Sequence, residues 1–301
     1  MIALYSKKEA GWEMNKRIAN QQLDSVRRVL AINDLSGHSH TSLMAVIPIM
    51  SRFGIAVTAL PTAILSSNTE HGGFVLADMT PHLNSFISHW ATMKLSFTAI
   101  YSGFLGSEQQ VEIVLRAMET FGKKQTLVVV DPVMADNGKL YPCFNKSIIQ
   151  SMQRLVAHAD LITPNLTEAA FLLGEPFKQN LSFREAKTWC RRLAGLGPRM
   201  VLITNVALQK ESGRTSVIAY DSWSDSFKRS VCSYLPVNYP GTGDIFTSVL
   251  TALLLNDTEL FDAVSRTVRF VSKAMKITIQ AGTPPNDGIA LEQALAFLPR
   301  L

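Results

Sequence analysis

The clearest chemical pattern in the sequence is Gly241-Thr242-Gly243-Asp244, which lies directly before an apolar run with helical spacing. Successive backbone N–H groups in a glycine turn at a helix start can bind an anion, and the helix dipole adds to the attraction. Asp244 lies within reach of the same point and could accept a proton from an attacking hydroxyl group. The pattern allows phosphoryl transfer, with the turn stabilising the charge that develops.

The same turn also has a purely structural interpretation. Asp244 could do no more than stabilise the first turn of its helix, and the glycines could serve only the bend. We also expect the helix N-terminus to lower the pKa of this carboxyl group, which makes Asp244 a weak base toward an alcohol. In a loose phosphoryl-transfer transition state a weak base suffices, because the proton leaves late.

Two further segments offer carboxylates. Asp131 ends the apolar run 127–130, where it could contact a cation or a nucleotide phosphate or serve only as a turn residue. Asn165 and Glu168 have the spacing of a capping box, and Glu168 could also organise Mg²⁺ through water.

His38, His40 and His71 do not predict a metal site, because a His-x-His loop offers no third ligand at suitable spacing.

The elements that must position these groups alternate between strand-like and helix-like patterns from residue 27 onward. Apolar runs predict strands at 27–33, 55–65, 160–165 and 199–205, strands that run into loops within 97–106 and 125–134, and an edge hairpin at 214–220 and 227–235. Helical spacing predicts helices at 41–54, 80–93, 108–122, 144–159, 166–174, 182–195, 242–256, 258–280 and 287–298. Such alternation predicts an α/β fold with a mostly parallel sheet, whose ligands bind beyond the carboxyl ends of the strands.

The length allows one large α/β domain or two ordinary ones, and the sequence favours one because it has no Pro/Gly/Ser-rich linker and no internal repeat. The chain has 301 residues, of which 47% are apolar and 18% charged, enough for a sizeable core. The net charge of +5 is scattered, so we expect no nucleic-acid partner, and no apolar run is long enough to span a membrane. Three widely spaced cysteines favour a reducing, cytoplasmic location. Residues 1–26 are interpreted as an extension without chemistry, and residues 27–301 as a single domain.

Taken together, the motifs resemble the ribokinase superfamily, and more closely its pyridoxal/pyridoxamine kinase branch. The segments that carry the resemblance occur in the expected order and cover nearly all of residues 27–298: AINDLSGHSHTSLMAVIPIMSRFGI, PTAILSSNT, IYSGFLGS, DPVMADNGKLY, TPNLTEAAFLLGE and GTGDIFTSVL. The resemblance implies a ribokinase-like three-layer α/β/α sandwich. It also implies ATP-dependent phosphorylation of the 5′-hydroxymethyl group of a vitamin B6 compound, with Mg²⁺, often K⁺, and a homodimer.

The resemblance also implies a role for individual residues. Asp244 matches the catalytic base, and Gly241, Thr242 and Gly243 match the anion hole. Asn165 and Glu168 match an element that supports magnesium, and Asp131 matches an aspartate on the cation and phosphate side. Thr204 and Asn205 lie where members approach ATP. On the substrate side the matching residues are Asp34, Ser36, Thr69 and Phe104.

Several positions depart from the family pattern on the substrate side. Phe104 stands where tyrosine is frequent, and Asn33 where relatives often have histidine. Ser39 and His40 replace a more usual Gly-Lys pair, and the segment SSNTEHGGF is longer than the family pattern by a small insertion. The anion hole and magnesium elements match. The departures therefore bear on the choice of the acceptor and not on phosphoryl transfer.

Alternatives stay open at this point. A hydroxymethylpyrimidine kinase uses the same fold, but its glycine-rich first loop differs from NDLSGHSHTS. Sugar and nucleoside kinases of the superfamily usually carry an early β-lid, whereas here a helix is predicted directly after the first strand. A non-catalytic protein that binds vitamin B6 or a nucleotide would not need the base Asp244. A structural or interaction protein would leave the polar clusters at the strand ends unexplained.

Overall fold

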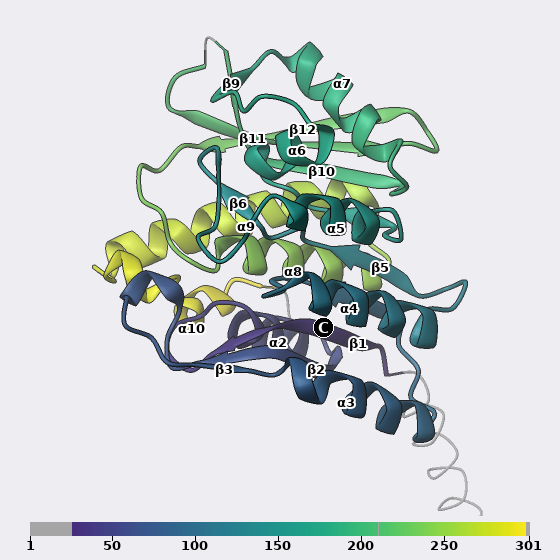
Figure 1. The fold of residues 1–301 in the computed structure, drawn as a ribbon. Coiled ribbons are helices and arrows are strands. Elements are labelled where there is room, and N and C mark those ends of the chain that lie inside the picture. Colours follow the sequence, from purple (N-terminus) through teal and green to yellow (C-terminus); the bar gives the residue numbers. More distant parts are fainter. Residues whose placement is uncertain (1–25, 210, 299–301) are drawn as a thin grey trace, which may run out of the picture.

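The computed structural model describes residues 26–209 and 211–298, and its centre is a ten-stranded sheet. The strands follow the order β12-β11-β10-β8-β5-β4-β1-β2-β3, and β9 pairs with β10. Their bounds are β1 (Arg28–Ser36), β2 (Ala56–Leu65), β3 (Leu76–Asp78), β4 (Ala99–Ser102), β5 (Leu127–Val130), β8 (Leu161–Ile162), β9 (Asn180–Leu181), β10 (Met200–Leu208), β11 (Arg214–Asp221) and β12 (Ser226–Ser233). In Figure 1 the sheet runs from β12 at the top to β3 near the bottom.

The central strands, from β10 to β2, are parallel to their neighbours. The outer pairings, β2 with β3, β10 with β11 and β11 with β12, are antiparallel. The predicted hairpin at 214–220 and 227–235 is therefore confirmed as an edge of a mostly parallel sheet.

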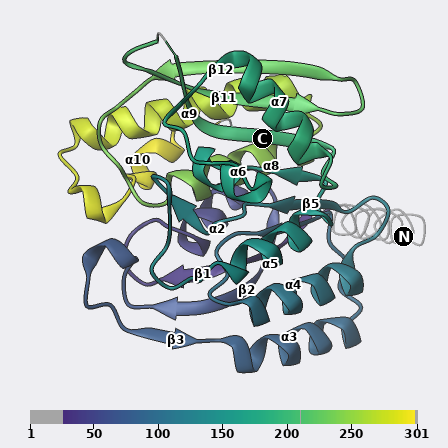
Figure 2. The ribbon, with the colours of Figure 1, turned by 45° about the horizontal axis from the view of Figure 1, so that its top comes forward.

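Helices cover both faces of the sheet. One face carries α3 (Thr80–Thr92), α4 (Glu108–Phe121), α5 (Ser147–Val156), α6 (Leu166–Leu173) and α7 (Phe183–Ala194), which contact one another in that order. The other face carries α2 (Leu43–Arg52), α8 (Thr242–Leu255), α9 (Leu260–Gln280) and α10 (Leu291–Leu295). Figure 2 shows α3 to α7 following one another across one side of the sheet. The three-layer, ribokinase-like sandwich is confirmed.

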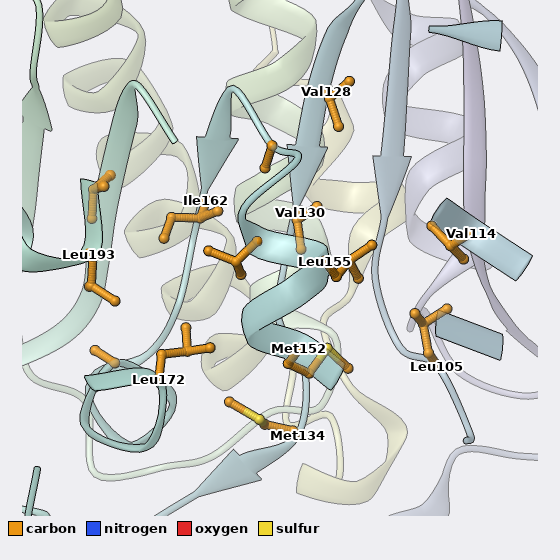
Figure 3. Packing of buried hydrophobic residues seen from close by; sticks show 14 of the residues in the cluster. Leu105, Val114, Val128, Val130, Met134, Met152, Leu155, Ile162, Leu172 and Leu193 are labelled. Atoms are coloured by element: carbon orange, nitrogen blue, oxygen red, sulfur yellow. The ribbon is translucent and has the colours of Figure 1, made fainter. Parts of the chain in front are cut away.

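Each helical layer has its own apolar core against the sheet, because parallel strands are buried on both faces. The α3–α7 side packs on strand residues such as Leu30, Ile100 and Val130, and Figure 3 shows part of this cluster. The α2–α8–α9 side packs on the alternate residues of the same strands, including Val29 and Tyr101. The period of two along each strand thus sends successive side chains into opposite cores.

Several short elements were not predicted. They are β3, β9, the hairpin of β6 (Ala135–Asp136) and β7 (Lys139–Leu140), and the 3₁₀ turns η1 (Thr69–His71) and η2 (Pro285–Asp287). The helix predicted over 287–298 was too long, because η2 and a loop occupy its first part and α10 holds only Leu291–Leu295. Pairings of two or three residues lack a periodic signal, so the sequence predicts them poorly.

Residues 1–25 of the predicted extension and residues 299–301 lie outside the described residues. Within the part of the chain that the structure describes, no helix combines the length and apolar character needed to cross a membrane. The cysteines at 143, 190 and 232 are all free thiols.

The order of the strands creates a binding edge. From β1 the chain proceeds to β2 on one side and later to β4 on the other, so the connections diverge between β1 and β4. The carboxyl end of such a divergence point is where open α/β sheets bind ligands. Residues that follow β1, β4, β5 and β8 all meet at this edge, together with the N-terminus of α8.

Candidate active site

Two segments that are distant from Asp244 in the sequence hold its carboxylate at this edge of the sheet. Its Oδ1 accepts a hydrogen bond of 2.9 Å from Nδ2 of Asn33, which lies in β1 just before the bulge. Its Oδ2 accepts one of 2.8 Å from the backbone N–H of Ser42, which precedes α2. Asn33 is itself fixed, because its Oδ1 accepts the backbone N–H of Phe104 at 2.8 Å. The carboxylate is therefore oriented by β1, by the segment after β4 and by the start of α2, not only by its own helix.

The turn before α8 requires glycine at its first position. Gly241 has a φ of 84°, and a Cβ built there would lie 2.2 Å from the backbone oxygen of His40. The loop after β1 and the turn are thus in direct contact. By helix geometry the first N–H groups of α8, those of Thr242, Gly243 and Asp244, have no carbonyl partner within the helix. They are available to an anion at the helix N-terminus, as predicted.

The structure corrects the expected titration of the base. Burial raises the pKa of Asp244 above the ordinary aspartate value, and the hydrogen bonds from Ser42 and Asn33 oppose this rise. The lowered pKa predicted from the helix N-terminus is wrong, because desolvation of the carboxyl group is the larger effect. A raised pKa makes Asp244 a better proton acceptor toward an alcohol.

Asp34 lies in a bulge of β1, where the register with β2 shifts between Asn33 and Leu35. Its carboxylate is buried and accepts hydrogen bonds from the hydroxyl groups of Ser36 and Ser42. Burial, together with the nearby charge of Asp244, raises the pKa of Asp34 to about 6. Ser42 thus contacts both carboxylates, with its hydroxyl group on one and its N–H on the other.

Asp131 and Glu168 lie on the other side of the turn. A Cβ on Gly243 would be 3.7 Å from Oδ2 of Asp131, and the hydroxyl group of Thr247, one turn along α8, lies 3.4 Å from the same oxygen. Burial and then the charge of Asp244 raise the pKa of Asp131 to about 7. Burial and the charge of Asp131 likewise raise the pKa of Glu168.

The predicted capping box is present, since Asn165 caps α6 and Glu168 closes the box. The two oxygens of Glu168 accept the backbone N–H groups of Asn165 at 2.8 Å and Met134 at 3.2 Å. The Asn165 amide also donates to the backbone oxygen of Ala135 at 2.8 Å. Glu168 is therefore fixed at the rim of the site, but both oxygens are already engaged.

Four carboxylates, Asp34, Asp131, Glu168 and Asp244, converge here, and no ion pair of the described residues involves any of them. Buried negative charge without a cation is costly. Oxygen donors are the ligands that Mg²⁺ prefers, and Mg²⁺ usually keeps several waters beside one or two carboxylates. The residues fit such an ion, with Asp131 nearest the turn and Glu168 suited to hold its waters.

The residues expected on the substrate side line the same edge. Phe104 follows β4, and its ring lies 5.7 Å from that of Phe144, between centroids. Both rings are half-buried and pack against each other just after β4. Thr69 begins η1 and is exposed. The segment SSNTEHGGF forms the short turn η1 and leads into the edge strand β3.

The two residues expected near the nucleotide lie within β10, which continues to Leu208 beyond the predicted end. Thr204 forms a bridge with Asn165, so it adjoins the residues predicted to support magnesium. Asn205 has a φ of 53°, is exposed and interrupts the pairing of β10 with β11 between Ile203 and Val206.

Sequence reasoning missed the functional placement of Asn33, Ser42 and Thr247. Asn33 was noted only as a departure from the family pattern, yet it orients Asp244. Ser42 has a φ of 53° and caps α2 without a side-chain hydrogen bond, because its hydroxyl group contacts Asp34. Thr247, three residues after Asp244, could have been found from helical spacing, whereas Ser42 has no comparable signal.

Comparison with known proteins agrees with this geometry. The model of the phosphomethylpyrimidine kinase family matches residues 45–287. The chain is 27% identical to a pyridoxal kinase of Rubrobacter xylanophilus, over 90% of this chain and 94% of that protein. It is also 27% identical to the thiamine biosynthetic bifunctional enzyme TH1 of Arabidopsis thaliana, over 88% of this chain and 50% of that protein.

A solved structure is more similar. A Bacteroides thetaiotaomicron protein of phosphomethylpyrimidine kinase type, crystallised with pyridoxal, is 40% identical. The superposition has a TM-score of 0.86 and covers 90% of this chain and 95% of that one.

The two glycines of the turn should respond differently to alanine. Gly241→Ala should lower the free energy of unfolding by at least about 2 kcal/mol, because of the positive φ and the contact with His40. In Gly243→Ala the added Cβ makes only ordinary contacts, so the free energy of unfolding should stay unchanged or rise by up to about 1 kcal/mol. Urea unfolding measures both. Equal effects would contradict the close approach of the two loops.

The buried carboxyl of Asp34 should make stability depend on pH. Its pKa is about 6 when folded and about 4 when unfolded, so the wild type loses stability as the pH rises from about 4 to 7. Asp34→Asn should therefore become more stable relative to the wild type over this range, by on the order of 3 kcal/mol. Unfolding free energies at several pH values measure the difference.

The matched control is Asp78→Asn. Hydrogen bonds from Thr80 lower the pKa of Asp78, so this carboxylate stabilises the fold above its unfolded pKa. Between pH 4 and 7 the difference in unfolding free energy between this control and the wild type should therefore stay nearly constant, because the titration of Asp78 lies below about pH 4. If the difference in unfolding free energy between the wild type and Asp34→Asn did not vary with pH, this would contradict the raised pKa of the buried Asp34 carboxyl group.

Proposed function

The chain belongs to the phosphomethylpyrimidine kinase family, and from this premise we propose that it transfers the γ-phosphoryl group of ATP to the 5′-hydroxymethyl group of a vitamin B6 compound. Membership of a kinase family makes the chain a phosphotransferase. The observation that carries the proposed reaction is the anchored carboxylate of Asp244 beside the free N–H groups of the turn. A binding protein would have no need of a carboxylate oriented from three elements.

In the proposed reaction Asp244 accepts the proton of the acceptor hydroxyl group as its oxygen attacks the γ-phosphorus. The bond from this phosphorus to the bridging oxygen breaks, and ADP leaves with the electron pair. The N–H groups of Thr242 and Gly243 bind the phosphoryl oxygens as their charge shifts. Mg²⁺, when bound, would neutralise phosphate charge, with Asp131 near the phosphates and Glu168 acting through water. A role for K⁺ stays an expectation from the resemblance.

Several observations support a B6 compound as the acceptor. The 40% identical Bacteroides thetaiotaomicron protein was crystallised with pyridoxal, and the Rubrobacter xylanophilus relative is a pyridoxal kinase. Phe104 and Phe144 offer an aromatic wall to a pyridine ring. Asp34, Ser36 and Thr69 would contact the acceptor from the loops after β1 and β2, and Thr204 and Asn205 would lie on the ATP side.

The second candidate is phosphorylation of a hydroxymethylpyrimidine, which the family name and the Arabidopsis thaliana relative favour. A single domain, a cytoplasmic location and a homodimer remain proposals as well. The apolar edge formed by Ile64, Val75 and Leu76, each at least 42% exposed, is consistent with an interface between two copies.

The reaction is tested by measuring ADP release from Mg·ATP with pyridoxal, pyridoxine, pyridoxamine and hydroxymethylpyrimidine offered separately. We expect turnover with at least one B6 compound, and Asp244→Asn should reduce kcat by about 10²- to 10⁴-fold, because it removes the base. Asp78→Asn serves as a folded control with a carboxylate replaced elsewhere. Turnover with the pyrimidine alone would overturn the acceptor. Nucleotide binding without turnover on any acceptor would favour the non-catalytic alternative.

The pH dependence of kcat/KM tests the role of Asn33. The base must be ionised, so activity should rise with pH through a pKa above the ordinary aspartate value. Asn33→Ala removes a hydrogen bond that favours the ionised form, so the acid limb of its profile should move to higher pH. A variant that loses the same fraction of activity at every pH would instead indicate a purely structural role for Asn33.

A further inference from the structure

Outside the carboxylate site, three ligand-type side chains from three separate loops meet at one point. Nε2 of His38 lies 3.5 Å from Oδ1 of Asp287, and Nε2 of His71 lies 3.3 Å from the same oxygen. The three ligand atoms all lie within 4.8 Å of one another. The loop after β1, the turn η1 and the turn η2 thus each contribute one side chain.

The two nitrogen-to-oxygen distances can be compared with those in a hydrogen bond and with those between the ligands of a metal ion. An N–H···O hydrogen bond is typically about 2.9–3.0 Å long, which is shorter than both distances to Asp287. A tetrahedral zinc ion with bonds of about 2.0–2.1 Å places its ligand atoms about 3.3–3.5 Å apart. The imidazole rings of His38 and His71 are tilted by 58°, with centroids 5.2 Å apart, so they do not stack on each other. The nitrogen-to-oxygen distances match the edges of a metal coordination shell.

Other contacts hold the three loops in this arrangement. The amide of Asn68 donates to Oγ of Ser39 and to the backbone oxygen of Asn286, both at 2.7 Å. The amide of Asn286 in turn donates to the backbone oxygen of Glu70 at 3.1 Å. Ser39, Glu70 and Asn286 are immediate neighbours of His38, His71 and Asp287 in the chain, and Asn68 lies three residues before His71. The backbone positions of the ligands are therefore set without help from their own side chains.

We propose that His38, His71 and Asp287 form a binding site for a divalent transition-metal ion of the zinc class. Two imidazole nitrogens and one carboxylate oxygen suit Zn²⁺ and its neighbours, whereas Mg²⁺ and Ca²⁺ prefer sets of oxygen ligands. Three protein ligands leave a fourth position open to water or another small ligand. The site is distinct from the proposed magnesium site at Asp131 and Glu168.

The position of the cluster gives such an ion a consequence for the neighbouring active site. His38 follows Ser36 by two residues, and His71 follows Thr69 by two, so each ligand adjoins a residue expected to contact the acceptor. Asp287 precedes Gly288, where an added Cβ would lie 3.1 Å from the backbone oxygen of Pro240, directly before the glycine turn. A bound ion would therefore tie both substrate loops to the segment that precedes α8.

The first test measures Zn²⁺ binding by competition with a chromophoric chelator at pH 7.5, in the presence of excess Mg²⁺ to occupy oxygen-rich sites. The full chain should bind one Zn²⁺ ion, and His71→Asn and Asp287→Asn should each weaken binding by more than about tenfold. The control His82→Asn replaces an exposed histidine on α3 and should bind as the wild type does. X-ray absorption of the zinc complex should show imidazole and oxygen ligands without sulfur.

A second readout is hydrogen exchange of the amides in residues 66–74. Zn²⁺ should slow this exchange in the wild type and in His82→Asn, but not in His71→Asn. Thermal unfolding checks that each variant is folded. Absence of Zn²⁺ binding, equal binding by His71→Asn, or sulfur ligation through a cysteine would each overturn the proposal and leave an ordinary histidine–carboxylate cluster. None of these measurements requires phosphoryl transfer, so the site can fail or succeed independently of the proposed reaction.

Discussion

The two hydrogen bonds on Asp244 are the contacts on which the rest of this active site depends. They join α8 to β1 and to the start of α2 across more than 200 residues of chain. To make them, the loop after β1 must contact the turn at Gly241, where only glycine fits, and Ser42 must adopt a φ of 53°. Strained backbone of this kind persists only where the surrounding structure enforces it. The fold therefore brings β1 and the start of α2 together with the distant N-terminus of α8, so that both contact the carboxylate of Asp244.

The four carboxyl groups buried at this edge of the sheet lower the stability of the folded protein. Burial raises the pKa values of Asp34, Asp131, Glu168 and Asp244, and in three of these groups the charge of a neighbouring carboxylate adds to the rise. A fold under selection for stability alone would not gather these groups at one edge. Their arrangement is explained if cationic partners arrive with the substrates. The same low-dielectric surroundings then strengthen each interaction with the transferred phosphoryl group.

Much of the fold could be predicted because its long elements have clear periodicity, and the motifs at the strand ends were found for the same reason. The hairpin β6–β7 was missed although its turn, Asn137-Gly138, has the expected residues and a positive φ at both positions. The pKa of Asp244 was predicted in the wrong direction, since burial depends on loops that the sequence does not place. His38 and His71 lacked a third ligand in the sequence because Asp287 lies more than 200 residues further on. Contacts between loops are set by the whole topology, which no local pattern contains.

The departures from the family pattern acquire a physical meaning in this setting. An asparagine at position 33 can hold both Asp244 and the backbone of Phe104, as a neutral amide has a donor and an acceptor. Unlike a histidine, it does not titrate between pH 5 and 8. Neither direct partner of Asp244, the Asn33 amide or the Ser42 N–H, then changes charge near neutral pH. Burial raises the pKa of Asp244 and these two hydrogen bonds oppose the rise, so the protonation of this carboxyl group depends on contacts whose own charge is constant near neutral pH. A cation that enters the site would lower this pKa further and stabilise the ionised carboxylate.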